Sequence, residues 1–346
     1  MNIAETRSFC VELLQRTGVP EDEAAITVDS LIHADLKKVS SHGLNRLPVY
    51  IKRIKANLVR AKAEMIMERD AAAIAVIDAQ YSIAQVIATR AMELAIGKAR
   101  SYGIGAVLVK NSGHFGMAAT YGLQAAREKM IGIVTSNVTP LMPAPGGASR
   151  VIGNNPLAIV APTKSDPITP DMAMSTVALG KLIVAKNAGM KIPLDWAVDK
   201  FGKVTDDPEA GIAGMMLPMA SHKGYALAIG LEILTGVMAG CFAWNISGLY
   251  DLSKRQSIAH MLIAINIASF VDLDEYYEQI ESLRSGLKNS KRAEGFAEIF
   301  LPGEIELRNL NSATSISLPE SVLKELNGLA RESGMAPLSQ EVAISK

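Results

Sequence analysis

A histidine and an arginine four residues apart suggest acid–base chemistry on a small acid. Within the segment Ser40-Ser41-His42-Gly43-Leu44-Asn45-Arg46, the spacing of His42 and Arg46 would put both side chains on one face of a helix. An imidazole with a pKa of about 6.5 can give a proton to a carbonyl oxygen and take it back in the reverse reaction. An arginine can hold a carboxylate through two parallel hydrogen bonds. An exposed helix start with ordinary surface side chains would give the same pattern, so the spacing alone leaves both interpretations open.

Polar segments also follow two predicted strands. After IGAVLVK (104–110) come Asn111-Ser112-Gly113-His114-Phe115-Gly116, in which two glycines flank His114 and permit a ligand to approach the backbone. After IGIVTS (131–136) come Asn137 and a loop rich in proline and glycine, 140–147. Ligands of open α/β sheets bind outside the carboxyl ends of strands, which favours both segments as parts of a site. A strand-to-helix turn with a structural histidine is the alternative for His114.

Three further segments carry weaker signals. Ile152-Gly153-Asn154-Asn155-Pro156 is typical of a turn. Asp171 precedes a predicted helix, where its carboxylate would be either an N-cap or a pocket group. His222-Lys223 opens another helix, whose free amides would suit a phosphate. We interpret His33 and His260 as structural.

Composition and missing motifs exclude several classes of protein. The chain has 346 residues, 49% of them hydrophobic, which is enough for a large core divided into two or three structural units. Its 35 basic and 35 acidic residues give no net charge, so no general field attracts nucleic acid or an anionic membrane. The sequence contains no GxGxxG, GxxxxGK[ST], HExxH or GxSxG motif.

The compartment is indicated by the cysteines and by the first residues. Cys10 and Cys241 cannot form a disulfide framework and have no metal-ligand spacing, which favours a reducing environment. The N-terminal residues form an amphipathic helical pattern rather than a secretory signal. The apolar stretch 225–244 is interrupted by Glu232 and several glycines, so we expect a buried core helix there rather than a membrane span. We therefore predict a cytoplasmic protein.

The elements that would position these residues alternate along the chain. Residues 1 to about 60 are predicted to be helical, with one helix ending near Gly18 and another opening after Pro20. From about residue 72, strands and helices alternate as in an α/β sheet covered by helices. The predicted strands are 72–79, 104–110, 131–136, 156–162 and 260–267, and the predicted later helices are 82–103, 117–129, 172–188, 272–287, 319–334 and a long one from Lys223. A hairpin is expected in 196–208, with Phe201 and Gly202 at the turn.

Eight segments in order carry a resemblance to a known family. They are SHGLNRLPVY, NSGHFG, the APGG loop, GNNPLAIVAP, DMAMS, KIPLDWAVDKFGKVTDDP, HKGYALAI and EGFAEIFLPGE. Over nearly its whole length the chain resembles the malate/L-lactate dehydrogenase family that is unrelated to the Rossmann lactate and malate dehydrogenases. The resemblance implies an α/β fold with a mixed-sheet, non-Rossmann cofactor domain and a helical domain built from both chain ends. The expected parts are a helical N-terminal part (1–70), the cofactor domain (71–240) and a C-terminal part packing back on both (241–346).

The same resemblance implies an activity and a set of partners. It implies an oxidoreductase that uses NAD or NADP and transfers a hydride to or from a small 2-hydroxy or 2-oxo acid, of the malate, lactate, sulfolactate or ureidoglycolate type. It also implies a homodimer. With the composition, we expect a cytoplasmic protein that has no metal, nucleic acid or membrane partner. A reductase of cyclic imino acids, of the piperideine-2-carboxylate type, is the enzymatic alternative.

Site residues follow from the matched motifs. By resemblance His42 is the proton donor, Arg46 anchors the substrate carboxylate, and His114 lines the same pocket; either histidine can be the acid and base. Asn154 and Asp171 are expected in the substrate pocket. The cofactor contacts implied by the motifs are Ser136, Asn137, Val138, Asp171, Met172, Ala173, Lys223, Gly224, Glu294, Gly295 and Phe296.

The chain also departs from the family pattern. It has Asn154 where many relatives read GTNP, Met174 where they read DMAT, and Ala226 where they read KGYG. The region 241–262 is shorter than is usual in the family. The departures at Asn154, Met174 and Ala226 motivate a second alternative, a non-catalytic member that binds nucleotide without turnover. The acid, the choice between NAD and NADP, and the physiological direction stay open at this point.

Overall fold

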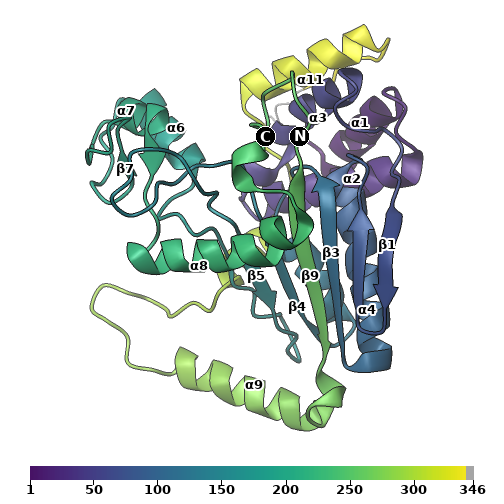
Figure 1. Ribbon diagram of the computed structural model, residues 1–346, viewed down its shortest axis with the longest axis vertical. Helices are drawn as coiled ribbons and strands as arrows, with labels where there is room; N and C mark the ends of the chain where they lie inside the picture. The colour runs from purple at the N-terminus through teal and green to yellow at the C-terminus, as the bar shows by residue number, and fades with distance from the viewer. Residues whose placement is uncertain (340–346) are drawn as a thin grey trace, which may run out of the picture.

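A mixed seven-stranded sheet runs through the computed structural model, which describes residues 1–339 (Figure 1). Its spatial order is β1-β2-β3-β9-β4-β5-β6; β2 and β3 pair in parallel, and the other neighbours pair antiparallel. The strands are β1 (Ile66–Ala71), β2 (Ile74–Asp78), β3 (Ile104–Ser112), β4 (Met130–Ser136), β5 (Leu157–Val160), β6 (Asp171–Met172) and β9 (Ile258–Asn266). The predicted mixed-sheet α/β fold is confirmed.

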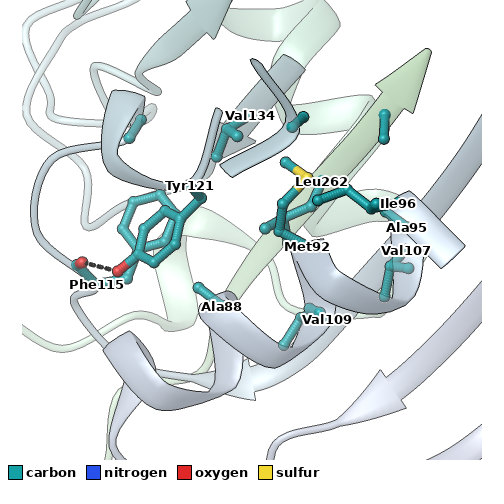
Figure 2. Close-up of a cluster of buried hydrophobic side chains, with 14 of the residues drawn as sticks. Ala88, Met92, Ala95, Ile96, Val107, Val109, Phe115, Tyr121, Val134 and Leu262 are labelled. Atoms are coloured by element: carbon teal, nitrogen blue, oxygen red, sulfur yellow. Dashed lines mark hydrogen bonds between the residues drawn. The ribbon is translucent and has the colours of Figure 1, made fainter. Parts of the chain in front are cut away.

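Two helices cover one face of this sheet. They are α4 (Ala84–Tyr102) and α5 (Ala119–Arg127), and their buried side chains meet those of β3, β4 and β9 in one core (Figure 2). Small side chains let α4 approach closely, because a Cβ on Gly105 of β3 would lie 1.9 Å from the Ala95 carbonyl oxygen. The Tyr121 hydroxyl donates a hydrogen bond to the Phe115 carbonyl (Figure 2). The core therefore reaches directly to the loop that carries His114.

A helical unit is built from both ends of the chain. It contains α1 (Ile3–Gln15), α2 (Glu21–Leu36), α3 (Leu47–Lys55) and α11 (Glu320–Glu332), whose apolar faces share one core. The amino group of Met1 donates to the Ile316 carbonyl at 2.9 Å, which joins the two ends directly. Figure 1 shows α11 beside the N-terminal helices. This part of the predicted fold is also confirmed.

A smaller unit contains α6 (Leu179–Asn187), β7 (Ala197–Val198), α7 (Pro208–Ala213), β8 (Met215–Met216) and α8 (His222–Glu232). The expected turn is present, with Gly202 at φ +81° and the Asp199 carboxylate accepting from the Phe201 and Lys203 amides. The prediction of a helix over 172–188 is wrong at its start. The backbone amides of residues 174 and 176 instead donate hydrogen bonds to the carbonyls of Asn154 and Leu217, so the helix begins only at Leu179.

The apolar stretch 225–244 is only half buried, which corrects the prediction of a buried core helix. It comprises α8, a π-helical turn (η3, Ile233–Val237) and a short 3-10 turn (η4, Ala243–Asn245). Ala228 and Leu231 face the interior, whereas Ile233, Val237 and Met238 are about half exposed. Hydropathy alone cannot distinguish a core face from an exposed apolar face. Among residues 1–339 there is no helix with both the length and the apolar character that a membrane crossing requires.

An extended arm follows the last strand. Helix α9 (Leu273–Lys288) lies below the body in Figure 1, and the segment after it reaches out under α8 before returning to α10 (Glu304–Ser312). Residues 289–297 are all exposed. The sequence patterns missed β1, β6, α7 and α10, since short or exposed elements carry little hydrophobic periodicity.

Two glycines set the distance between α5 and β4, and replacing one should destabilise the protein. A Cβ on Gly132 would lie 2.6 Å from the Gly122 carbonyl oxygen, a backbone atom that cannot move independently of α5. We expect Gly132→Ala to lower the free energy of unfolding by about 1–3 kcal/mol. Gly97→Ala on α4, where a Cβ meets nothing within 4 Å, should raise it by roughly 0.5–1 kcal/mol. Urea unfolding measures both, and an unchanged midpoint for Gly132→Ala would refute this packing argument.

Candidate active site

His42 and Arg46 are held by two tight turns rather than by one helix. Residues Ser40–His42 (η1) and Leu44–Arg46 (η2) are 3-10 turns, and between them Gly43 is extended, with φ −90° and ψ −159°. The prediction of one shared helix face is therefore wrong. The cause is Asp35, whose carboxylate accepts the Leu44 amide at 2.8 Å and lies 1.9 Å from where a Cβ on residue 43 would be.

The structure brings His42 and His114 together as a stacked pair. Their ring centroids lie 5.5 Å apart, and the ring planes differ by 17°. The Ser41 hydroxyl bonds Nδ1 of His42 at 2.9 Å, and the Tyr50 hydroxyl bonds Nδ1 of His114 at 2.6 Å. Because both Nδ1 atoms are engaged, Nε2 is the atom of each ring available to a reacting substrate.

Arg46 lies beside this pair and is oriented by two hydrogen bonds. Its Nε donates to the Ser41 carbonyl at 2.7 Å, and its Nη1 donates to the Tyr250 hydroxyl at 2.5 Å. The guanidinium carbon lies 5.8 Å from the centroid of the Tyr250 ring. These contacts leave Nη2 and one Nη1 hydrogen for an anionic ligand.

Both histidines are neutral at neutral pH. Burial, and then the charge of Arg46, lower the pKa of His42 to about 4. Burial, and then the charges of His42, Arg46 and His260, hold the pKa of His114 well below its ordinary value. Burial raises the pKa of Tyr50, so its phenol stays protonated. A neutral imidazole can accept a proton, and an anion bound to Arg46 would offset part of the lowering of both histidine pKa values.

Buried side chains support the His114 loop from behind. The Phe115 ring stacks on His260 at a centroid distance of 4.2 Å. His260 is fully buried, and its Nδ1 lies 2.9 Å from the Ser136 hydroxyl. The Gln256 side chain accepts the His114 amide at 3.4 Å. Strand β9 places His260 opposite both Val109 and Ser136, so a C-terminal strand fixes the wall behind the site.

Comparison with known families identifies the family of the chain. Residues 1–327 match the family model described as malate/L-lactate dehydrogenase. The chain belongs to the malate/L-lactate dehydrogenase family. Malate dehydrogenase of Pyrococcus abyssi is 37% identical over 344 residues, covering 96% of this chain and 95% of the relative. An NADP⁺-dependent (2R)-3-sulfolactate dehydrogenase of Chromohalobacter salexigens is 36% identical over 335 residues, covering 95% and 98%.

The likeness extends to a solved structure. Sulfolactate dehydrogenase from Methanocaldococcus jannaschii superposes with a TM-score of 0.91 at 36% identity, covering 96% of this chain and 97% of the relative. The non-Rossmann sheet arrangement is therefore that of the family.

Three of the residues predicted to contact the cofactor lie at the end of β4. They are Ser136, the last residue of the strand, and Asn137 and Val138, which follow it. The side chains of Ser136 and Asn137 are buried and hydrogen-bonded to the protein, and the Val138 amide donates to Asn155 at 3.2 Å. Asn137 donates to the carboxylate of Glu232, which also accepts from the Asn155 side chain and the Ala243 amide. In this arrangement the side chains of Ser136 and Asn137 hold neighbouring segments in place.

Asp171 caps a helix, but a different one from that predicted. It belongs to β6, and its Oδ2 accepts the Ala119 amide at the start of α5 at 2.9 Å. Met172 is exposed and Ala173 is half buried. Asn154 is half buried and donates to the Ser175 hydroxyl at 3.2 Å, while its carbonyl accepts the Met174 amide at 2.8 Å. Asn154 and Met174, two of the departures from the family pattern, thus contact one another through the backbone.

The remaining predicted residues lie on α8 and on the arm. Lys223 is exposed and Gly224 buried in the first turn of α8; a Cβ on Gly224 would lie 2.3 Å from the Met219 carbonyl oxygen. Glu294, Gly295 and Phe296 form an exposed turn of the arm, with Gly295 at φ +83°. The arm passes beneath α8 (Figure 1).

Sequence reasoning missed Tyr50, Tyr250 and Gln256. A signal existed for Tyr50, which is four residues after Arg46 on α3 and closes the motif SHGLNRLPVY. Tyr250 and Gln256 lie in the 247–256 loop before β9, about 200 residues from Arg46 in the sequence. Only the insertion of β9 between β3 and β4 brings that loop to the site.

Proposed function

We propose that the stacked histidine pair and Arg46 are the acid–base and anchoring groups of an NAD(P)-dependent oxidoreductase acting on small 2-hydroxy and 2-oxo acids. The observation that carries this proposal is the neutral His42–His114 pair beside an oriented guanidinium. The relatives are named malate and sulfolactate dehydrogenases, which are enzymes of such acids.

Each residue has a distinct task in this reaction. Arg46 holds the substrate carboxylate, which places the hydroxyl carbon near the imidazole rings. In oxidation the histidine pair accepts the hydroxyl proton through Nε2, and in reduction it returns that proton to the carbonyl oxygen. Tyr50 and Ser41 fix the ring orientations through Nδ1.

Exposed residues on α8, β6 and the arm carry groups that suit a dinucleotide. Lys223 and the first-turn amides of α8 suit a pyrophosphate. Asp171 offers a carboxylate oxygen to a hydroxyl or amide group, and the exposed ring of Phe296 offers an apolar surface for a base. When bound, the nicotinamide cofactor donates or accepts the hydride. Relatives whose names state a cofactor include both NAD⁺ and NADP⁺ enzymes.

The active form that we propose is a cytoplasmic homodimer. Exposed apolar side chains support the dimer; they are Ile183 and Val184 on α6, and Ile233, Leu234, Val237 and Met238 at η3 and directly after it. Cys10 and Cys241, which are both free and buried, suit a reducing compartment. Sedimentation equilibrium should give twice the 36.9 kDa of one chain, and Val237→Asp with Met238→Asp should halve that mass.

A substrate panel tests the activity. Absorbance of NADH and NADPH is followed with oxaloacetate, pyruvate, sulfopyruvate and a cyclic imine, and the oxidised cofactors are tested with malate, lactate, sulfolactate and ureidoglycolate. Turnover of at least one acid is expected. Turnover of the imine alone would transfer the proposal to an imino acid reductase, and cofactor binding without any turnover would refute catalysis.

The low histidine pKa values predict an unusual pH profile. In oxidation the accepting imidazole must be neutral, so kcat/KM falls only as the pH drops toward about 4, and not through about 6.5 as for an exposed histidine. Removing the positive charge in Arg46→Gln should raise the histidine pKa values and move this acid limb to higher pH. The profile is measured with the acid that turns over, with fluorescence as a check on folding at each pH. A wild-type limb near pH 6.5 would contradict this assignment.

A further inference from the structure

Arg53 is a buried arginine that holds a loop beside the candidate active site. It is 1% exposed, and its guanidinium donates to the backbone carbonyls of Leu249 at 3.1 Å, Asp251 at 2.7 Å and Lys254 at 2.9 Å. Burying a guanidinium costs free energy unless its donors are well paired. Here Nη1 and Nη2 donate to backbone carbonyls of a single loop, 247–256, whereas the buried Nε has no partner among the described residues. That loop is therefore held in one position relative to α3.

The carbonyls that Arg53 holds flank the residue that touches Arg46. Leu249 and Asp251 are the neighbours of Tyr250, whose hydroxyl accepts the Arg46 Nη1 hydrogen at 2.5 Å. Arg46 is the N-cap residue of α3, and Arg53 lies in the last turn of the same helix. The two ends of α3 thus carry Arg46, which is proposed to anchor the acid, and Arg53, which holds the loop that contains Tyr250.

The Tyr250 hydroxyl has a hydrogen to offer beside Arg46. A phenol that accepts an N–H bond keeps its own O–H as a donor. An anion bound to the free edge of Arg46 is the acceptor that this donor would meet. The rest of the loop is braced internally, because Asp251 accepts from the Ser253 amide and Gln256 donates to the Ser247 carbonyl.

We propose that Tyr250 is a specificity-determining residue of the acid site, donating a hydrogen bond to the substrate carboxylate held by Arg46, and that Arg53 is the positioning residue that fixes Tyr250 there. This inference rests on the proposed function of the site. It assigns to the 247–256 loop the selection of an oxyanion over a neutral group at that end of the substrate.

The kinetic test uses Tyr250→Phe, which removes only the hydroxyl. With the acid that turns over, KM for the acid should rise roughly tenfold, as for loss of a hydrogen bond to a charged group, while kcat and the cofactor KM stay within about twofold. Arg53→Lys keeps the positive charge but loses the planar guanidinium with its several donors, and it should raise the KM for the acid by the same factor. The double variant should be no worse than Tyr250→Phe, since both changes remove one interaction. The exposed Tyr102→Phe is the matched control and should leave every constant unchanged.

A binding measurement separates this proposal from the proposed activity. Oxalate is titrated by calorimetry into wild type and Tyr250→Phe in the presence of NADH or NADPH, which requires no turnover. About tenfold weaker oxalate binding by the variant supports the proposal even if no acid in the panel reacts. Equal affinities, or no oxalate binding by wild type, would overturn it, as would an unchanged acid KM in Tyr250→Phe or multiplying effects in the double variant.

Discussion

Replacing Arg46 with Ala should raise the KM for the acid substrate far more than the KM for the cofactor. The lost contact is a charged bond in a partly buried site, and removing one partner of such a pair costs roughly 2–5 kcal/mol. That corresponds to a loss in kcat/KM for the acid of about 30-fold to a few thousand-fold. The Arg46 guanidinium donates hydrogen bonds to Ser41 and Tyr250. Arg46 is not one of the residues proposed to contact the cofactor, so the KM for the cofactor should change little.

Steady-state kinetics with each substrate varied in turn measures this difference. Arg46→Lys retains the positive charge but lacks the planar guanidinium, so its KM for the acid should lie between those of wild type and Arg46→Ala. Arg100→Ala, an exposed arginine on α4, is the control and should change neither KM. Similar losses for acid and cofactor in Arg46→Ala would show that Arg46 supports the whole site and does not anchor the acid.

Replacing either histidine of the pair with Asn should lower kcat by roughly 10²–10⁴-fold, the usual contribution of an acid–base group. We expect His42→Asn and His114→Asn to be comparable, because the rings stack at 5.5 Å and the charge of one lowers the pKa of the other. Groups that act as a unit give losses that do not multiply. The double variant should therefore be about as slow as the slower single variant.

The measurement is kcat at saturating acid and cofactor, with calorimetric cofactor binding as the control for an intact fold. Asn preserves much of the polarity and volume near Nδ1, so the hydroxyl partners Ser41 and Tyr50 keep a group to bond. A full multiplication of the two losses would mean separate roles for the histidines. A loss below about fivefold in one single variant would remove that residue from the acid–base role.

The sequence determined the elements with strong local signals. Periodicity located α4, α9 and α11, and apolar runs located β3 and β9, because one buried face per element leaves a regular pattern. Motif resemblance identified the family, which the matched model and relatives confirm. It also predicted His42, Arg46 and His114, three side chains that the structure places around one site.

Only the tertiary structure decided how those residues meet. The helix expected to carry both His42 and Arg46 is broken at Gly43 by the Asp35 carboxylate, a contact between residues on different elements. Asp171 caps α5, a helix that precedes it by more than forty residues in the sequence. Local patterns cannot report such contacts, since they depend on which strands become neighbours. The insertion of β9 between β3 and β4 brings Tyr250 to Arg46, and no feature near either residue encodes that pairing.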